Sequence, residues 1–195
     1  MWRQSTEVGG IAYTNLLPLS TTAVGGTTIY GGDYNSDGTP DGYKTNTKLS
    51  GSGGGESTAG SGKEAMCSSG FIYPVATGDI LRIKGVTPVT GSNHYVVGYD
   101  SAGTRTGSDP FVYNNNDTNL YWTTNSSSGK YTIEDNDENN PQNATLVYTI
   151  NAEKLGANVH AVRVCAAMGE NTIITLNQEI KEGGGTVIVE KWAST

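Results

Sequence analysis

The sequence predicts an all-β fold, an antiparallel β-sandwich of jelly-roll type with long polar loops and little helix. The composition supports this prediction, because Gly supplies 27 of the 195 residues and charged residues make up only 16% of the chain. Such a composition disfavours long helices and suits short strands joined by tight turns. The patterning supports it too, since apolar and β-branched segments recur at short intervals with turn residues between them.

The expected strands are the segments in which apolar and β-branched residues alternate or cluster. In chain order they are residues 27–30, 43–49, 70–75, 79–86, 94–99, 111–113, 120–124, 130–133, 144–150, 159–168, 172–176 and 186–192. Asp37-Gly38, Asp41-Gly42 and Ser128-Gly129 supply turn residues, so we expect hairpins rather than parallel crossovers. Only NAEKLG, residues 151–156, is typical of a helical turn, with Gly156 as its stop.

The chain length predicts one domain. We expect an N-terminal arm at 1–13, the sandwich at 14–180, and a Gly hinge with a strand at 181–195 that pairs with another chain. The segment SGSGGGESTAGSGK, residues 50–63, has the composition of a flexible linker, so we expect order there only where something, such as a neighbouring subunit, holds it.

Charge and hydropathy exclude several classes of partner. The net charge of -7 leaves no broad basic surface, so we expect no nucleic-acid binding. No apolar run approaches about 18 residues and the first ten residues lack a signal-peptide core, so we expect neither membrane insertion nor classical secretion. Cys67 and Cys165 are expected to be buried free thiols rather than a disulfide, and His94 and His160 to be strand residues rather than metal ligands.

The loop GGDYNSDGTPDGYK, residues 31–44, matches the first half of a calcium-loop motif. Its candidate Ca²⁺ ligands alternate along the chain and are Asp33, Asn35, Asp37, Thr39 (through its carbonyl) and Asp41. Lys44 stands where a bidentate Glu is expected and a strand should follow, so an EF-hand is excluded. A calcium loop of a β-protein and an Asp-rich hairpin turn both stay open, and no other cofactor is required.

Polar aromatic residues indicate a second candidate site. The chain has 11 Tyr and 3 Trp but only 2 Phe, and Tyr and Trp suit sugar stacking and wet interfaces. The densest stretch is residues 111–131, whose candidate contacts to a glycan or a protein are Tyr113, Asn115, Asp117, Tyr121, Trp122 and Tyr131. The competing interpretation is that alternate members, such as Trp122, point into the core.

No catalytic set is recognisable in the sequence. STAGSGKE, residues 57–64, lacks the first Gly and the Ser or Thr of a P-loop, and no G-x-S-x-G elbow occurs. The acidic run at 134–140 lacks a turning Gly and is read as a solvated loop. We therefore expect no enzyme activity, although paired carboxylates that meet only in the fold keep a hydrolase open as a third hypothesis.

Six segments of the sequence together resemble a known group of proteins. They are TNLLPLS (14–20), DGYKTNTKLSGSGGGE (41–56), SGFIYPVATGDILRIKG (69–85), HYVVGYDSAGTRTG (94–107), VHAVRVCAAM (159–168) and NTIITLNQEI (171–180). In this order they are similar to β-sandwich domains of minor tail and receptor-binding proteins from phages and prophages of gut Firmicutes. The resemblance implies a jelly-roll-like sandwich, similar to carbohydrate-binding modules and displayed on a virion, and it supplies no catalytic residues.

The function that follows is that of a non-enzymatic virion structural protein of a bacteriophage, in the tail, a fibre or a capsid decoration. Such a protein is assembled in the bacterial cytoplasm. Its expected partners are copies of itself, other virion proteins and a host-surface glycan. The alternative is a secreted bacterial carbohydrate-binding module, which would bind glycans as a monomer.

Overall fold

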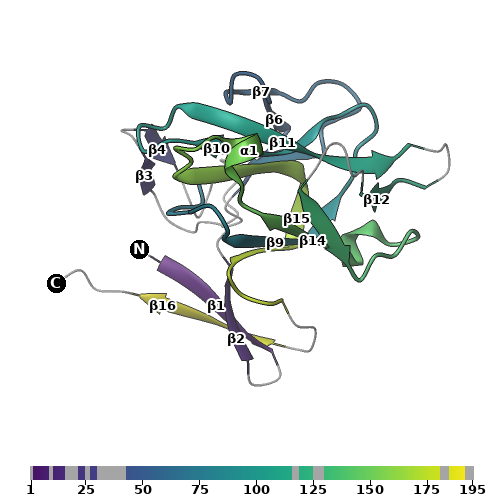
Figure 1. Ribbon diagram of the computed structural model, residues 1–195. Helices are drawn as coiled ribbons and strands as arrows, with labels where there is room; N and C mark the ends of the chain where they lie inside the picture. The colour runs from purple at the N-terminus through teal and green to yellow at the C-terminus, as the bar shows by residue number, and fades with distance from the viewer. Residues whose placement is uncertain are drawn as a thin grey trace.

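The computed structural model describes residues 43–115, 119–124 and 130–180 with their side chains, the Glu170 side chain excepted, and the backbone of 2–8, 11–15, 22–24, 27–29 and 185–191. Its regular structure is almost entirely β-strand, and the strands pair antiparallel (Figure 1). The predicted all-β class is therefore confirmed, whereas jelly-roll connectivity stays a prediction. Within the described residues, no helix combines the length and apolar character needed to cross a membrane.

The body of the molecule is a nine-stranded sheet in the order β12-β11-β10-β15-β9-β14-β13, with β8 paired to β15 and β5 paired to β8. The strands are β5 (Tyr43–Thr45), β8 (Met66–Ser69), β9 (Ile80–Thr87), β10 (His94–Tyr99), β11 (Arg105–Asn114), β12 (Tyr121–Thr123), β13 (Tyr131–Glu134), β14 (Thr145–Thr149) and β15 (Ala161–Leu176). The two ends of the sheet approach each other at Tyr131, whose hydroxyl accepts from the Val112 N–H at 2.7 Å and donates to the Thr123 carbonyl. The sheet is thus nearly closed into a sandwich-like body.

Strand β15 lies between the β12-β11-β10 half and the β9-β14-β13 half of this sheet. Its first part pairs with β10 and its last part, from Ala167 on, with β9. Within the β9 pairing, Gly169 to Thr172 stand opposite Gly85 alone. The Thr172 hydroxyl accepts from the Gly169 N–H at 2.8 Å and donates to the Gly85 carbonyl at 2.7 Å. This bulge bends β15 along its pairing with β9.

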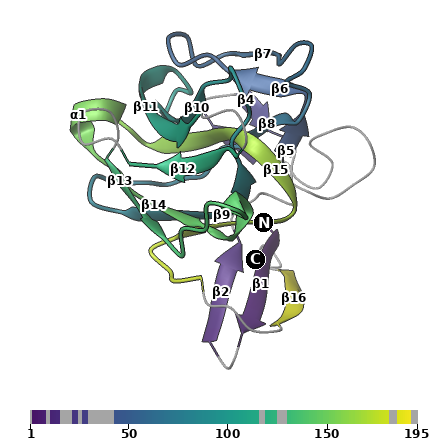
Figure 2. The same cartoon turned by 90° about the vertical axis from the view of Figure 1, so that its right-hand side faces the viewer.

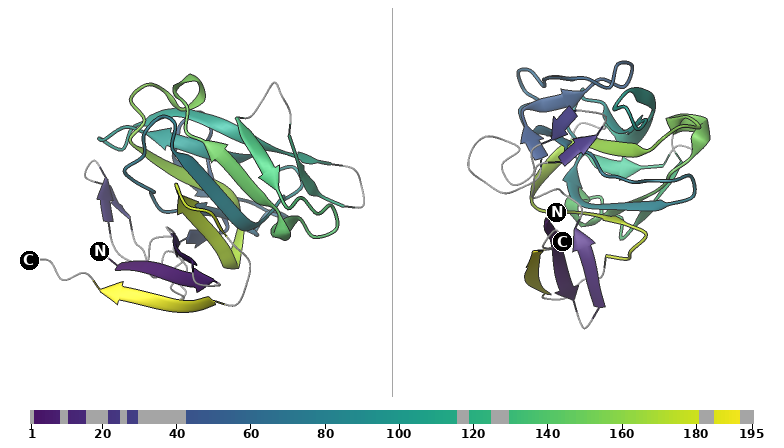
Figure 3. Two further views of the ribbon diagram at one scale, coloured as in Figure 1. Left: turned by 60° about the horizontal axis from the view of Figure 1, so that its bottom comes forward. Right: turned by 90° about the vertical axis from the view of Figure 1, so that its left-hand side faces the viewer.

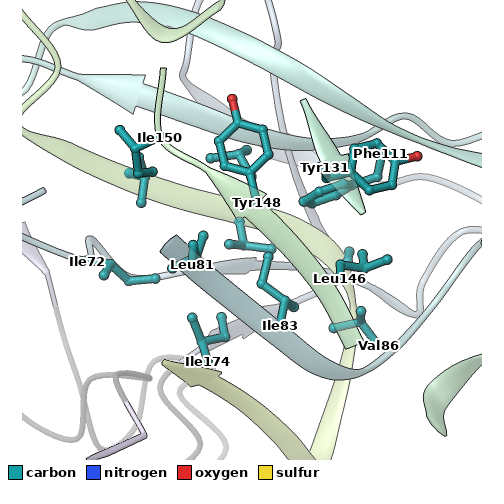
Figure 4. Packing of buried hydrophobic residues seen from close by; sticks show 14 of the residues in the cluster. Ile72, Leu81, Ile83, Val86, Phe111, Tyr131, Leu146, Tyr148, Ile150 and Ile174 are labelled. Carbon is teal, nitrogen blue, oxygen red and sulfur yellow. The ribbon is translucent and has the colours of Figure 1, made fainter. Parts of the chain in front are cut away.

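The core lies between the two halves. In β9, Leu81 and Ile83 are buried while their neighbours are half-exposed, and the alternation shifts at Gly85 so that Val86 is buried next. Figure 4 shows the side chains that meet there, among them Ile72, Phe111, Tyr131, Leu146, Tyr148, Ile150 and Ile174. Each fully buried aliphatic or aromatic side chain of this kind stabilises the fold by about 1.5–3 kcal/mol.

A second apolar cluster covers the outer face of β8, β10 and β15. The hairpin of β6 (Thr47–Leu49) and β7 (Glu56–Thr58) contributes Leu49 and then Ala59, which are buried with Phe71 and Val97. The segment at 50–63, which has the composition of a linker, is held in place by the sheet of its own chain. In Figures 1 and 2 the hairpin lies at the end of the molecule opposite the strands near the termini.

Those strands form a separate three-stranded sheet in the order β16-β1-β2. It comprises β1 (Trp2–Val8), β2 (Ile11–Asn15) and β16 (Gly185–Lys191), with β16 paired to β1 from Lys191↔Trp2 to Gly185↔Val8. Figure 3 shows β1 and β16 side by side in this sheet. The expected boundary between residues 13 and 14 falls inside β2, and the C-terminal strand, expected to pair with another chain, here has a partner within its own chain. A further hairpin joins β3 (Thr22–Val24) to β4 (Thr27–Ile29).

Some of the elements predicted from the sequence are present in the structure and others are not. The helical turn is confirmed as α1 (Ala152–Leu155), where the Asn151 side chain accepts from the Lys154 N–H and Gly156 ends the helix. A short 3₁₀ turn, η1 (Pro141–Asn143), precedes β14. The strand predicted at 70–75 is wrong, because this segment holds only an isolated bridge between Ile72 and Val162. The strands expected at 159–168 and 172–176 are joined in β15.

Candidate functional site

A polar cleft of about 500 Å³ lies where residues 48–63 meet residues 91–95. The end of β6 and the loop after it form one wall, Lys63 another, and the turn before β10 with the first residues of that strand forms the rest. The lining residues are Lys48, Leu49, Ser50, Gly51, Ser52, Ser57, Lys63, Gly91, Ser92, Asn93 and Tyr95. Hydroxyls, amides and ammonium groups thus surround the one aromatic ring of the set.

Hydrogen bonds to its backbone carbonyls hold the glycine-rich wall of the cleft in place. The Tyr99 hydroxyl donates to the Gly54 carbonyl at 2.7 Å, and the Ser108 hydroxyl donates to the Gly51 carbonyl at 2.9 Å. Within the loop, the Ser50 N–H donates to the Gly55 carbonyl at 2.9 Å. The wall is therefore fixed by β10 and β11, which makes the cleft a preformed feature.

Glycine is required where this wall approaches the sheet. A Cβ at Gly51 would lie 2.9 Å from Cζ of Tyr95, so the ring of Tyr95 packs directly on the Gly51 backbone. Gly54 has a φ of +68°, and a Cβ there would lie 2.7 Å from Cβ of Arg105. The small residues thus let the loop lie close enough to close one side of the cleft.

The two lysines of the cleft are held differently. The Lys63 ammonium donates to the Gly91 carbonyl and so bridges two walls. Lys48 is exposed and, among the described residues, forms no ion pair. Asp and Glu do not occur in the lining set, so the charged side chains that line the cleft are both cationic.

Cys165 lies beneath this wall, where its Sγ accepts from the Leu49 N–H at 3.4 Å. Burial raises the pKa of the Cys165 thiol to about 11, so the group is protonated at neutral pH and is a poor nucleophile. Both cysteines are buried and neither forms a disulfide, as expected from the sequence. Burial, and then the neighbouring Cys165, also raises the pKa of the Tyr95 hydroxyl, which therefore stays a neutral donor.

A charged cluster beside the hairpin is engaged in structural contacts. The Arg163 guanidinium lies 5.1 Å from the ring centre of Phe71, donates to the Ser69 carbonyl at 2.7 Å and pairs with Glu56. The second carboxylate oxygen of Glu56 accepts from Lys44 at 3.2 Å. Glu56 is thus held by two cations and ties β7 to the sheet.

The predicted contact surface at 111–131 is only partly available at the surface. Trp122 and Tyr131 are buried, with the Trp122 indole donating to the Val86 carbonyl at 3.1 Å, so neither can serve as a stacking surface. For these two residues the core interpretation is correct, because the aromatic rings fill the space between the sheet halves. Asn115 is exposed, Tyr121 is half-exposed, and Asp117 lies outside the described residues.

Tyr113 is the member of the predicted set that connects to the cleft. Its hydroxyl accepts from the Gly91 N–H at 3.0 Å, and Gly91 lines the cleft. Tyr113 is half-buried and its ring meets the His94 ring edge-on at 5.2 Å. It therefore supports the turn that carries the cleft rather than lining it.

The calcium hypothesis lies outside the described residues, since Asp33, Asn35, Asp37, Thr39 and Asp41 all precede residue 43. In the described part of the chain, no group of three or more His, Cys, Asp or Glu side chains could hold a metal ion. In the acidic loop after β13, Asp137 accepts from the backbone of Asn139 and from the backbone and side chain of Asn140. These bonds, that from the Asn140 side chain foremost, lower the pKa of Asp137. The loop is a self-bonded, solvated turn, as predicted.

One carboxylate is buried in the core, away from the cleft. Asp109 on β11 accepts from the Tyr148 hydroxyl at 3.0 Å and from the Lys130 N–H at 3.2 Å through the same oxygen. Its other oxygen has no hydrogen-bond partner among the described residues, and burial raises the pKa of this carboxyl. Because Asp109 is fully buried, it links the two halves of the sheet rather than facing a substrate.

Sequence reasoning missed Lys48, Lys63 and Tyr95 as members of one site. The available signal was weak: two lysines flank a Gly- and Ser-rich segment in an acidic chain. Comparisons with family models, with curated proteins and with solved structures give no match for this chain.

Proposed function

We propose that this protein is a non-enzymatic structural protein of a bacteriophage virion whose cleft binds a host-surface glycan. The observation that carries the proposal is the preformed polar cleft beside Tyr95. Its volume of about 500 Å³ falls within the range of about 300–1,000 Å³ that is usual for small-molecule sites. The resemblance of the strand and turn segments to phage tail and receptor-binding domains supports a location in a virion.

The chemistry of the lining residues suits a saccharide. A sugar presents an apolar ring face and a rim of hydroxyl groups, and Tyr95 offers an aromatic face together with a polar edge. Ser50, Ser92 and Asn93 add short side chains that can both donate and accept hydrogen bonds. The nearly closed sheet behind them provides a rigid frame for these contacts.

A glycan array tests the binding function. We expect the wild-type protein to retain a defined subset of glycans and Tyr95→Ala to reduce that binding about tenfold, equivalent to about 1.4 kcal/mol. Tyr121→Ala is the comparison variant, because Tyr121 is half-exposed and belongs to the candidate contact surface at 111–131 but does not line the cleft; loss confined to this variant would place the glycan at that surface instead. Equal loss in both variants, or binding to no glycan, would count against the proposal.

A secreted carbohydrate-binding module is the second candidate function. The pairing of β16 with β1 favours it, because a chain that supplies its own partner strand can act as a monomer. Mass spectrometry of purified phage particles separates the two candidates. Recovery of the chain in stoichiometric amounts supports the virion protein, whereas recovery only as a free monomer in the culture medium supports the module.

A further inference from the structure

We propose that the cleft takes an anionic glycan, a saccharide that carries carboxylate or phosphate groups, with Lys48 and Lys63 as the residues that bind the anion. This inference rests on the proposed function and names the class of its ligand. Three observations support it. The charged side chains of the cleft are cationic whereas the chain is acidic, the two lysines differ in exposure and contacts, and the other lining residues combine an aromatic ring with neutral hydrogen-bonding groups.

The charge of the cleft is opposite to that of the whole molecule. The chain has 12 Lys and Arg against 19 Asp and Glu, a net charge of -7. The lining residues nevertheless include two lysines and no Asp or Glu. Glu56, on the neighbouring strand β7, is bound by Arg163 and Lys44.

The two ammonium groups differ in a way that suits one fixed and one adaptable contact. Lys63 is half-buried and donates to the Gly91 carbonyl, which holds its Nζ at the cleft wall and leaves further N–H donors on the same atom. Lys48 is exposed and, among the described residues, has no ion-pair partner. An anionic group at this place meets a positioned cation and a second cation that can move to it.

The rest of the wall favours a saccharide over a bare anion. Tyr95 offers a ring face beside the lysines, and the serine and asparagine side chains offer neutral hydrogen bonds. A small inorganic anion would use the ammonium groups and leave the ring uncovered. A polyhydroxylated ligand with an anionic substituent uses both parts of the cleft.

Titration calorimetry with three probes tests the inference: oligogalacturonate, its fully methyl-esterified form and a phosphomannan oligosaccharide. The first two share the sugar backbone and differ by the charge and one methyl group on each carboxyl, so we expect oligogalacturonate or the phosphorylated oligosaccharide to bind tighter than the ester by about fivefold or more. The preferred anionic probe identifies the ligand group as carboxylate or phosphate. Added NaCl should weaken the binding of that probe and leave ester binding unchanged.

Lys48→Gln is the central variant, because Lys48 makes no ion pair with the residues that the structure describes. We expect it to reduce binding of the preferred anionic probe about fivefold and to leave the ester unchanged. Lys63→Gln should act in the same direction. Lys130→Gln removes the same charge at an exposed residue outside the cleft and is the control that should change neither.

The failure of this inference and that of the proposed function give different results. Glycan-array binding that depends on Tyr95, together with equal affinity for the ester and both anionic probes and a silent Lys48→Gln variant, overturns the anionic ligand and leaves glycan binding standing. Loss of all glycan binding on the array overturns the proposed function itself. An equal effect of Lys130→Gln would show that only net charge matters, which also overturns the assignment to the cleft.

Discussion

His94 is a buried titratable side chain at the start of β10. It is fully buried, its Nε2 accepts from the Val89 N–H at 3.0 Å, and its ring meets the rings of Trp122 and Tyr113 edge-on. Burial lowers the pKa of His94 from 6.5 to about 4. The imidazole is therefore neutral in the folded protein at physiological pH, and this state anchors the turn that carries Gly91 of the cleft.

The depressed pKa makes stability depend on pH in a defined window. Above pH 6.5 the histidine is neutral in both states, whereas between 6.5 and about 4 the unfolded chain binds a proton that the folded protein does not. The free energy of unfolding should therefore fall by about 3 kcal/mol across this window from His94 alone. Denaturant titrations from pH 7.5 to 4.5 measure the fall.

One variant isolates the histidine from other titrating groups. His94→Gln keeps an acceptor for the Val89 N–H but cannot titrate, so its stability should fall less steeply than that of the wild type. An unchanged slope in His94→Gln would contradict the assignment.

The Tyr131 hydroxyl joins the two ends of the sheet. Removing this hydroxyl should lower the free energy of unfolding, because it leaves a backbone group without a hydrogen-bond partner. Tyr131→Phe keeps the edge-on contact with Phe111, whose ring centre is 5.1 Å away, but leaves the Val112 N–H without its acceptor. We expect a loss of about 1–3 kcal/mol in the free energy of unfolding. Tyr121→Phe, at a half-exposed tyrosine, should cost less than about 0.5 kcal/mol; equal costs would exclude the closing role.

At the scale of elements, the bulge in β15 depends on the residue opposite it. Gly85 has a φ of +78°, and a Cβ there would lie 2.4 Å from the Asn171 carbonyl oxygen. Gly78 has a φ of +95° with no atom within 4 Å of the same position. The two glycines therefore separate backbone strain from steric overlap.

We expect Gly78→Ala to lose about 1–2 kcal/mol from backbone strain and Gly85→Ala to lose a further 1–3 kcal/mol, approximately, from overlap with the bulge. Thermal or denaturant unfolding of both variants measures the difference. If Gly85→Ala is no less stable than Gly78→Ala, the close approach of β9 to the bulge is not the feature that requires glycine.

The elements that sequence patterning predicted well are those with one buried and one exposed face. Leu81 and Ile83 alternate with half-exposed residues, and β10 was predicted at its observed bounds, 94–99. Strand β8 was missed because all four of its residues are buried, so MCSS carries no alternation. The hairpin at 47–58 was missed because its glycines also fit a linker, and the contacts that hold them come from Tyr99 and Ser108.

At the scale of the whole molecule, the cleft could not be predicted because the two regions that line it, residues 48–63 and 91–95, meet only in the fold. Lys48 and Lys63 belong to the first region and Tyr95 to the second, and no local motif connects them. The segment at 111–131 does carry a local signal, but a tyrosine or tryptophan in it can face the core or the solvent equally well. Pattern alone could not decide that Trp122 fills the core.

The sheet formed by the two ends of the chain gives the last prediction. The sequence indicates that the C-terminal strand pairs with another chain, whereas β16 pairs with β1 of the same chain from Gly185 to Lys191. Intrachain pairing does not depend on protein concentration, but pairing between chains is lost on dilution. We expect the amide protons of β16 to exchange at the same slow rate at high and low micromolar concentrations. A Val189→Pro variant removes one N–H and breaks the ladder, so it should speed exchange in β1 as well as in β16. If the protection of the β16 amide protons from exchange falls on dilution, the prediction that this strand pairs with another chain is correct.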